Sequence, residues 1–246
     1  MNFFSLFKRK IIYSLKKKID IDKVDFQNKS LDFLFHHYES DKAFIFKKNG
    51  KPGHGYSDFY SKELKSLKNK NKKLNILEIG SFGGASAAAF RKYFKDVNVF
   101  CFDINISNFN YKSKNIFVYG LDINNKESVD KYLNKVFKIN ETGFFDLIVD
   151  DGSHNLKDIF LSLKYLFKFL KKNGTYIIEE YKHPNYYNYN RNIEHIFVDE
   201  FLKNLKNKKF SVSSILDKND QKYLIESISG INIYKGNLKD SDICFI

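Results

Sequence analysis

Hydrophobic and polar residues follow two alternating patterns from residue 74 onward. Runs of four to seven residues, rich in Ile, Val and Phe, have the length and composition of buried strands. Between them, hydrophobic residues recur every three or four positions, as in amphipathic helices. The expected strands are Asn75–Ile79, Val97–Asp103, Ile116–Tyr119, Phe145–Asp150 and Thr175–Glu179, and the expected helices are Ala85–Phe94, Lys126–Phe137, Leu156–Leu170 and Arg191–Leu205. Strands that alternate with helices predict an α/β fold with a mostly parallel sheet.

The end of the chain departs from this alternation. Phe210–Leu216 and Tyr223–Tyr234 both have the composition of strands, and the polar tetrapeptide Asp217–Asp220 lies between them. We therefore expect a C-terminal antiparallel hairpin, which would complete a seven-stranded sheet.

The first part of the chain has a different character. Residues 1–19 place hydrophobic side chains at helical spacing between lysines and an arginine, which predicts a basic amphipathic helix. No hydrophobic run is long enough to span a bilayer, and charges interrupt any signal-peptide core. The helix could lie on an anionic membrane surface, on the body of the protein or on a second subunit. We divide the chain into a helical cap, residues 1–70, with turn residues at 48–53, and a domain at residues 71–246.

Charge is concentrated in the cap. The formal net charge is +13, of which residues 1–73 carry +10 and residues 74–246 carry +3. Two cysteines, Cys101 and Cys244, are too few for a disulfide framework, so we expect a cytoplasmic protein, with the inner face of the membrane as an option. The nearly neutral domain makes nucleic acid an unlikely partner.

A glycine-rich turn follows the first strand of the domain. Its spacing, Gly80-x-x-Gly83-Gly84, matches neither the dinucleotide fingerprint nor the phosphate loop. A turn of this kind brings the backbone close to a bound ligand. We therefore expect Gly80, Ser81, Phe82 and Ser86 to contact a cofactor. Asp103, at the end of the second strand, is placed to accept hydrogen bonds from ribose hydroxyls.

Carboxylates follow other strands at the same edge of the predicted sheet. Asp150 and Asp151 are adjacent and repel each other unless a cation lies near them. Asp122 follows the preceding strand and supplies a third acid. Oxygen ligands suit magnesium or manganese, so we expect Asp122, Asp150 and Asp151 to bind a metal. His154 is our first candidate for a general base, alongside Asp150; the alternative is that His154 caps the following helix or orders Asp150.

The segment Glu78-Ile79-Gly80, together with the antiparallel end of the sheet, resembles the class I S-adenosylmethionine-dependent methyltransferases. The resemblance implies a Rossmann-like fold and S-adenosylmethionine as the cofactor. It also implies that Glu78 helps to fix the methionine end of the cofactor and that Asp150 lies near it.

Residues 36–180 resemble a narrower group, the metal-dependent sugar O-methyltransferases of the macrocin and mycinamicin type. The segments that carry the resemblance are Tyr38–Lys42, His54–Tyr56 with Tyr60, Asp150–His154 and Glu179-Glu180. They imply a magnesium or manganese ion and acceptor contacts from His54, Tyr56 and Glu180. His183 lies in an aromatic loop, Tyr181–Arg191, that we expect over the acceptor; a plain surface loop is the alternative.

One segment departs from that group. Where the group usually carries Gly-Asp-Gln-x-Asp, this chain has Gly120-Leu121-Asp122-Ile123-Asn124-Asn125. Asp122 is then either an acid on the adenine side of the cofactor or a metal ligand, and Asn124 or Asn125 replaces the second acid.

We therefore expect a homo-oligomeric O-methyltransferase acting on a sugar hydroxyl, in a nucleotide sugar or a surface-polysaccharide precursor. The alternatives are an RNA methyltransferase and a non-catalytic membrane-surface protein that retains a cofactor fold.

Overall fold

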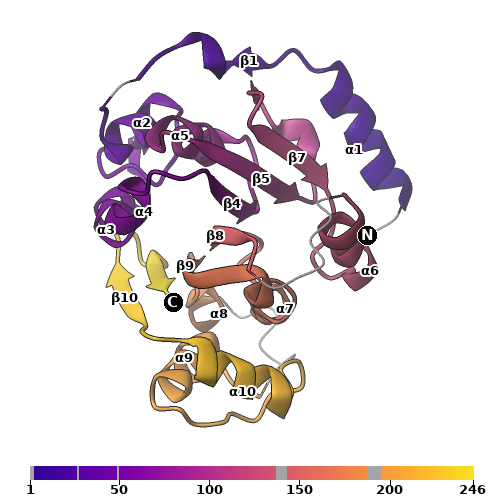
Figure 1. Cartoon of the computed structure of the whole chain (residues 1–246), viewed down its shortest axis with the longest axis vertical. Coiled ribbons are helices and arrows are strands. Elements are labelled where there is room, and N and C mark those ends of the chain that lie inside the picture. The colour runs from indigo at the N-terminus through magenta and orange to yellow at the C-terminus, as the bar shows by residue number, and fades with distance from the viewer. Residues whose placement is uncertain (1–2, 27, 49, 137–142, 188–194) are drawn as a thin grey trace.

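The computed structural model describes residues 3–26, 28–48, 50–136, 143–187 and 195–246. Its centre is a seven-stranded sheet with helices on both faces (Figure 1). The strands are β4 (Leu74–Ile79), β5 (Val97–Asp103), β7 (Ile116–Gly120), β8 (Phe145–Asp150), β9 (Leu170–Ile178), β10 (Asn232–Lys235) and β11 (Asp242–Phe245), in the order β10-β11-β9-β8-β4-β5-β7. This is the predicted α/β fold with a mostly parallel sheet.

The register of the parallel strands aligns their carboxyl ends. Ile79, the last residue of β4, pairs with Phe102 of β5 on one side and with Asp150 of β8 on the other. Asp150 in turn pairs with Ile178, the last residue of β9. The segments that follow these four strands therefore begin side by side at one edge of the sheet, where ligands of open α/β sheets gather.

Alternate residues of each strand point to opposite faces and enter two hydrophobic cores. In β4, Leu77 and Ile79 enter one core, whereas Leu74 and Ile76 enter the other. The first core is shared with α7 (Leu156–Leu166) and α9 (Val198–Lys206), and the second with α5 (Ala85–Tyr93). The remaining elements of the domain are α6 (Lys126–Asp130), η3 (Lys131–Val136), η2 (Ile106–Asn108), η4 (Phe167–Phe169), α8 (His183–Tyr186) and α10 (Lys218–Ser227).

The cap packs against the second face of the sheet. Leu34 and Phe35 of α2 and Tyr60 of α3 are fully buried in the same core as Ile76 and Phe90. The elements of the cap are α1 (Phe3–Leu15), β1 (Ile19–Asp20), η1 (Ile21–Lys23), α2 (Leu31–His37), β2 (Lys47–Lys48), β3 (Lys51–Pro52), α3 (Ser57–Glu63) and α4 (Lys65–Lys68). The strand β1 pairs with β6 (Tyr111–Lys112) of the domain. The division at residue 70 stays a prediction, and the two parts share one core.

The C-terminal hairpin is present, but not where the sequence placed it. It consists of β10 and β11, and β11 runs antiparallel to both β10 and β9. Phe210–Leu216 is not a strand. The second predicted strand, Tyr223–Tyr234, belongs to helix α10 as far as Ser227 and to strand β10 only from Asn232. Asp217 accepts hydrogen bonds from the backbone of Asn219 and Asp220, and the Asp220 side chain accepts from the backbone of Asp217. This capping box begins a helix where we expected a turn, because Asp and Asn favour both.

The other predicted strands are confirmed to within one residue, except that β9 begins five residues before the predicted Thr175, and the predicted helices are shorter than expected. Helix α5 ends one residue early, whereas the predicted helix from Leu156 changes to a 3-10 turn at Phe167. The helix predicted from Arg191 begins at Val198, and residues 191–194 lie outside the described part of the chain. So do residues 188–191 of the predicted acceptor loop.

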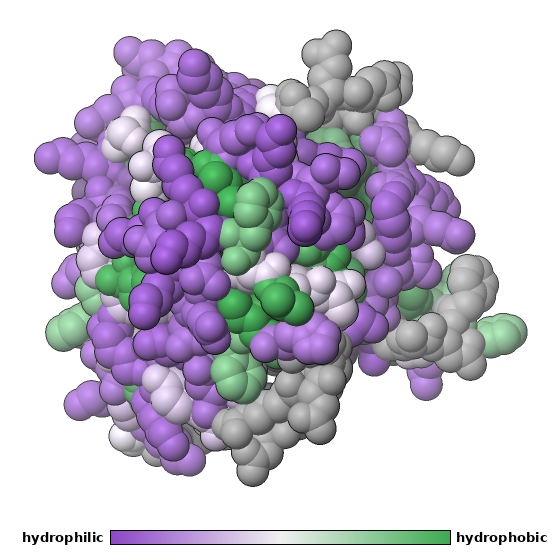
Figure 2. All heavy atoms as spheres, turned by 90° about the horizontal axis from the view of Figure 1, so that it is seen from below, coloured by the Kyte–Doolittle hydropathy of each residue, from purple (hydrophilic) through white to green (hydrophobic). Residues whose placement is uncertain are grey.

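The surface is largely polar, since most large hydrophobic side chains lie in the two cores. The face seen from below in Figure 1 is mostly hydrophilic, with small groups of hydrophobic residues near its middle (Figure 2). Cys101 and Cys244 are both buried and free. Within the described ranges, every helix is too short or too polar to cross a bilayer.

We expect the substitution Asp217→Ala to lower the free energy of unfolding by about 1 kcal/mol, because α10 loses its N-cap. Chemical denaturation measures this change. The matched control is Lys218→Ala, one residue on, which leaves the cap intact; equal effects of the two substitutions would contradict the role of Asp217.

Candidate active site

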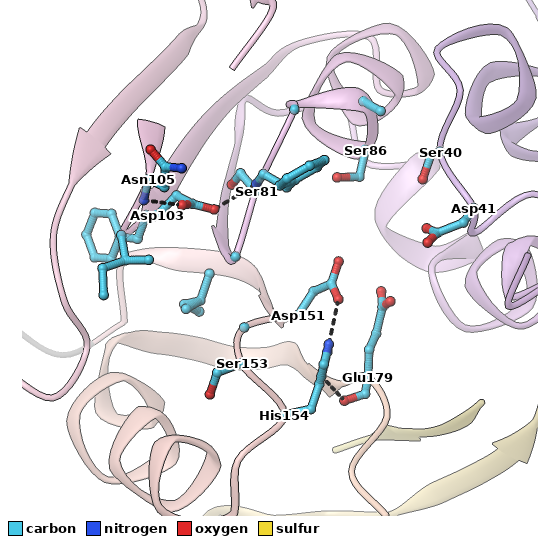
Figure 3. A pocket seen from close by; sticks show the side chains of 18 of the residues that line it. Ser40, Asp41, Ser81, Ser86, Asp103, Asn105, Asp151, Ser153, His154 and Glu179 are labelled. Carbon is cyan, nitrogen blue, oxygen red and sulfur yellow. Dashed lines mark hydrogen bonds and ion pairs between the residues drawn. The ribbon is translucent and has the colours of Figure 1, made fainter. Parts of the chain in front are cut away.

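A cavity of ≈ 790 Å³ opens at the carboxyl edge of the parallel strands, within the range that suits a small-molecule ligand. The glycine turn after β4 and the segment after β5 line one side, and the segments after β8 and β9 line another. Ser40 and Asp41 of the cap complete the wall, so that the cavity lies between the cap and the sheet (Figure 3).

The glycine turn has its special geometry because of neighbouring segments of the protein. Gly80 has φ +81°, and a Cβ there would lie 1.8 Å from the backbone oxygen of Asp151. Gly84 also has φ +81°, and its Cβ would overlap the ring of Phe109. Gly83 is different, since its Cβ would have Asn110 Nδ2 as nearest neighbour at 3.6 Å. We expected glycines to clear a ligand, but at Gly80 and Gly84 the fold itself already forbids a side chain.

Asp103 holds the glycine turn against the end of β5. Its carboxylate accepts hydrogen bonds from the backbone nitrogens of Phe82, at 2.7 Å, and Asn105, at 2.5 Å (Figure 3). Phe82 is 70% exposed and has φ +41°, an uncommon value for a residue with a side chain. Asp103, Phe82, Ser81 and Ser86 all line the cavity, as the sequence predicted for cofactor contacts. Their contact with a cofactor stays a prediction.

Glu78 lies behind this wall rather than in it. It is fully buried and is not among the residues that line the cavity. Ser86 donates a hydrogen bond to one carboxylate oxygen of Glu78, and the other has no hydrogen-bond partner among the described residues. Burial raises the pKa of Glu78 to about 6, against the charge of Lys42. Glu78 therefore supports Ser86, which lines the cavity, and does not line the cavity itself.

Three side chains converge on the opposite side of the cavity: Asp151, His154 and Glu180. A ligand atom from each lies within 4.8 Å of the other two. His154 Nε2 is 2.8 Å from Glu180 Oε2 and 3.7 Å from Asp151 Oδ1. His154 Nδ1 is 3.3 Å from the backbone oxygen of Glu179 (Figure 3). Two carboxylates and an imidazole form a donor set that suits a divalent cation.

The same contacts shift both pKa values of the His154–Glu180 pair. Burial favours neutral imidazole, but the hydrogen bond and charge of Glu180 outweigh it and raise the pKa of His154 to about 9. Burial also disfavours the carboxylate of Glu180, but His154 lowers the pKa of that group to about 2. In the metal-free protein the two residues therefore form an ion pair at neutral pH.

The backbone is strained at both residues of this pair. His154 has φ +54° and Glu180 has φ +46°, in the left-handed region that favours glycine. Such conformations cost on the order of 1–3 kcal/mol and are retained at functional sites. Both strained residues direct their side chains to the same point.

Lys42 is the main site residue that the sequence analysis missed. Its ammonium donates to Asp151 Oδ2 at 2.5 Å and to Glu179 Oε2 at 2.6 Å, and Tyr60 donates to the other oxygen of Glu179. Burial disfavours the charge, but Asp151 and Glu179 outweigh it and raise the pKa of Lys42 well above its ordinary value. The signal was present in the segment Tyr38–Lys42, which we quoted for its resemblance without assigning the lysine a contact.

Among the described residues, the structure does not group Asp122, Asp150 and Asp151 as one possible metal site, and a metal bound by these three stays a prediction. Only Asp151 belongs to the described group that could hold a metal. Asp150 is 4% exposed and does not line the cavity; it lies on the same face of β8 as Ile148, which enters the core shared with α7, and Asp150 Oδ1 accepts a hydrogen bond from the backbone nitrogen of Gly152 at 3.3 Å. The reason is alternation, because neighbours along a strand point to opposite faces. Burial raises the pKa of Asp150 to about 7. Asp150 therefore does not line the cavity, and its predicted catalytic and cofactor roles stay predictions.

Asp122 lines the cavity on the side of the glycine turn and Asp103. It accepts hydrogen bonds from the backbone and side-chain nitrogens of Asn124, at 3.0 and 3.3 Å. Its location fits the option of an acid on the adenine side of a cofactor, and a cofactor contact stays a prediction.

The predicted acceptor residues surround Glu180 to different extents. His54 lines the cavity, with Nδ1 3.3 Å from Glu180 Oε1 and 2.8 Å from Ser241 Oγ. Tyr56 is fully buried and donates to Glu180 at 3.3 Å, so it supports that carboxylate from behind the wall. His183 is not among the lining residues, and its ring lies 5.8 Å from the ring of His154.

The fold is shared with solved methyltransferases. The MycE methyltransferase from the mycinamycin biosynthetic pathway, in complex with Mg and SAH, matches with a TM-score of 0.64 and 20% identity, over 89% of this chain and 54% of that one. Its complex with Mg, SAH and mycinamycin VI matches with a TM-score of 0.64 and 21% identity, over 89% and 53%. A second crystal form with Mg and SAH gives a TM-score of 0.65 and 20% identity, again over 89% and 53%.

This chain thus spans about half the length of the methyltransferase it matches. No protein-family model and no curated protein matches its sequence.

We expect Gly80→Ala to destabilise the protein by more than about 1 kcal/mol, because it adds a side chain at positive φ against the backbone of Asp151. The matched control Gly83→Ala, in the same turn, has room for its methyl group. Thermal unfolding compares them, and a Gly80→Ala protein as stable as the control would contradict the packing described.

We also expect stability in chelator to fall as pH rises through about 9. The pKa of His154 is 6.5 in the unfolded chain and about 9 in the folded protein, so folding favours protonated His154. This stabilisation is complete below pH 6.5 and is lost as the pH rises through about 9. The effect is on the order of 1–3 kcal/mol. Urea unfolding across about pH 6 to 10 measures it. His154→Asn should flatten the profile in this range; an unchanged slope would show that another group titrates.

The order of the strands, with β11 antiparallel between β9 and β10, and the glycine turn at the carboxyl edge agree with the structural matches: the chain has the fold of the class I S-adenosylmethionine-dependent methyltransferases.

Proposed function

We propose that the protein transfers the methyl group of S-adenosylmethionine to a hydroxyl of a sugar, carried in a nucleotide sugar or a polysaccharide precursor, with the assistance of magnesium or manganese. One observation carries the proposal: a single cavity brings the glycine turn and Asp103 together with Asp151, His154 and Glu180. A cofactor wall and a proton-handling group thus face the same space.

The glycine turn and Asp103 form the cofactor side of this proposal. Asp103 retains lone pairs beyond those used by Phe82 and Asn105, so it can still accept from ribose hydroxyls. Phe82 is exposed at the cavity and offers a flat hydrophobic surface. Holding the sulfonium methyl beside a bound hydroxyl supplies alignment, a large part of the rate gain in such a transfer.

The acidic group forms the acceptor side. Asp151 and Glu180 would hold a divalent cation, because their carboxylate oxygens fit magnesium or manganese, while His154 Nε2 beside them would stay free of the cation. When bound, the cation supplies positive charge that lowers the pKa values of an acceptor hydroxyl and of His154. Neutral His154 accepts the proton of the hydroxyl, and Glu180 stabilises the imidazolium that results. Lys42 holds Asp151 and Glu179 in place.

The acidic wall argues against an RNA substrate. Asp41, Asp151, Glu179 and Glu180 all line the cavity, against Lys42 and His154, and the Lys42 ammonium is already engaged by two of these acids. A polyanionic phosphate chain would be repelled at this wall, whereas a neutral sugar ring would not, so the phosphates of a nucleotide sugar would have to lie away from it.

Methyl transfer to a panel of nucleotide sugars, with magnesium or manganese and with chelator, tests the proposal. We expect His154→Asn to lower the rate by about 10²–10⁴ while S-adenosylmethionine binding is retained, because a general base is lost. The matched control is His36→Asn, on the exposed surface of α2. Failure to bind S-adenosylmethionine by calorimetry would overturn the whole proposal; full activity in chelator would overturn the metal part alone.

A further inference from the structure

Helix α1 is attached to the protein through its polar side. Arg9 donates to the backbone oxygen of Ile104 at 2.8 Å, and Lys16 donates to those of Ser107 and Asn108 at 3.0 and 2.9 Å. Tyr13 packs edge-on against Phe109. These contacts fix α1 along the outer edge of the molecule, beside β7 and the segment after β5 (Figure 1).

The opposite side of α1 is hydrophobic and faces outward. Phe4, Phe7, Ile11 and Leu15 recur at helical spacing and are 77%, 55%, 44% and 81% exposed. We call these four residues the outer stripe. A surface helix ordinarily turns its hydrophobic stripe to the core, whereas α1 does the reverse. An exposed stripe of this size marks an interaction surface.

The charge around the outer stripe indicates what covers it. Residues 1–19 contain six lysine or arginine residues and no acidic residue, and Lys8 and Lys17 are exposed. In a chain of net charge +13, pairing two such helices would bring like charges together. An anionic lipid surface instead complements the lysines and accepts the outer stripe.

We propose that α1 binds the surface of an anionic lipid bilayer, with the outer stripe buried at the boundary between headgroups and acyl chains. This is an attachment to one surface, since α1 is far too short and too charged to cross. Arg9 links α1 to Ile104, which lines the cavity, so the bilayer would lie beside the cofactor side of the candidate active site. The proposal does not depend on the methyl-transfer reaction.

Flotation of the full chain with lipid vesicles tests it directly. Vesicles of equal parts phosphatidylcholine and phosphatidylglycerol should carry the protein, and vesicles of phosphatidylcholine alone should carry much less. Added salt should weaken binding because it screens the lysines.

Two double variants separate the hydrophobic and electrostatic parts. Phe7→Asn with Leu15→Asn should lower the vesicle partition coefficient at least about tenfold, since two large side chains no longer insert. Lys8→Gln with Lys17→Gln should lower it by about 30-fold, at about fivefold for each lysine.

The matched control is Phe210→Asn with Val212→Asn, which removes two hydrophobic side chains, 54% and 74% exposed, from the segment between α9 and α10. It should bind vesicles like the original protein. Circular dichroism and thermal unfolding confirm that each variant folds. No binding to the anionic vesicles, or an equal loss in the control, would overturn the proposal. The proposal would also be overturned if analytical ultracentrifugation showed a dimer that the outer-stripe substitutions dissociate, because the outer stripe would then join two copies of the chain.

Discussion

The buried contact of Lys42 with Asp151 and Glu179 is the constraint on which the candidate site depends. The parallel sheet ends in several carboxylates at one edge, and burying them together without a cation would be very unfavourable. Lys42 supplies that cation from the cap, 109 residues before Asp151 in the chain. Because Lys42 is almost fully buried, the cap cannot separate from the sheet without leaving buried charges uncompensated. The cap is therefore part of the site rather than a neighbouring module.

Of the two carboxylates that Lys42 contacts, only Asp151 remains partly exposed to the cavity. Glu179 is buried and accepts hydrogen bonds from Lys42 and Tyr60. Asp151 is partly exposed; its Oδ2 contacts Lys42 and its Oδ1 faces His154 Nε2. Strain at His154 and Glu180 turns both side chains to the same point. Rigid support behind this point comes from Tyr56 and His54, which contact Glu180. The arrangement holds a histidine between carboxylates in a cavity large enough for a small-molecule ligand.

The polar side chains of α1 attach it to the protein, whereas its hydrophobic side chains face outward. The helix is held by side-chain hydrogen bonds to backbone oxygens, and its hydrophobic residues contribute little to the cores. A sequence pattern alone gives the amphipathic character of such a helix but not which side is attached. Helix α1 and the cavity both contact the segment that follows β5, because Arg9 donates to the backbone oxygen of Ile104 and Ile104 lines the cavity.

The sequence by itself determined the α/β class, the strands β4, β5, β7 and β8 and the last residues of β9, because buried strands are hydrophobic runs whose length and flanking turns are local properties. It also determined the glycine turn and the presence of acids at the carboxyl edge. It misplaced the hairpin, since Asp217 and Asp220 suit a turn and a helix N-terminus equally well.

Only the tertiary structure decided which acids share a site. Asp150 and Asp151 are neighbours in sequence, but strand alternation sends the first toward α7 and leaves the second at the cavity. Glu179 contacts Lys42 and Tyr60, which precede it by 137 and 119 residues in the sequence. No local pattern encodes such a meeting, because it depends on how the cap packs on the sheet.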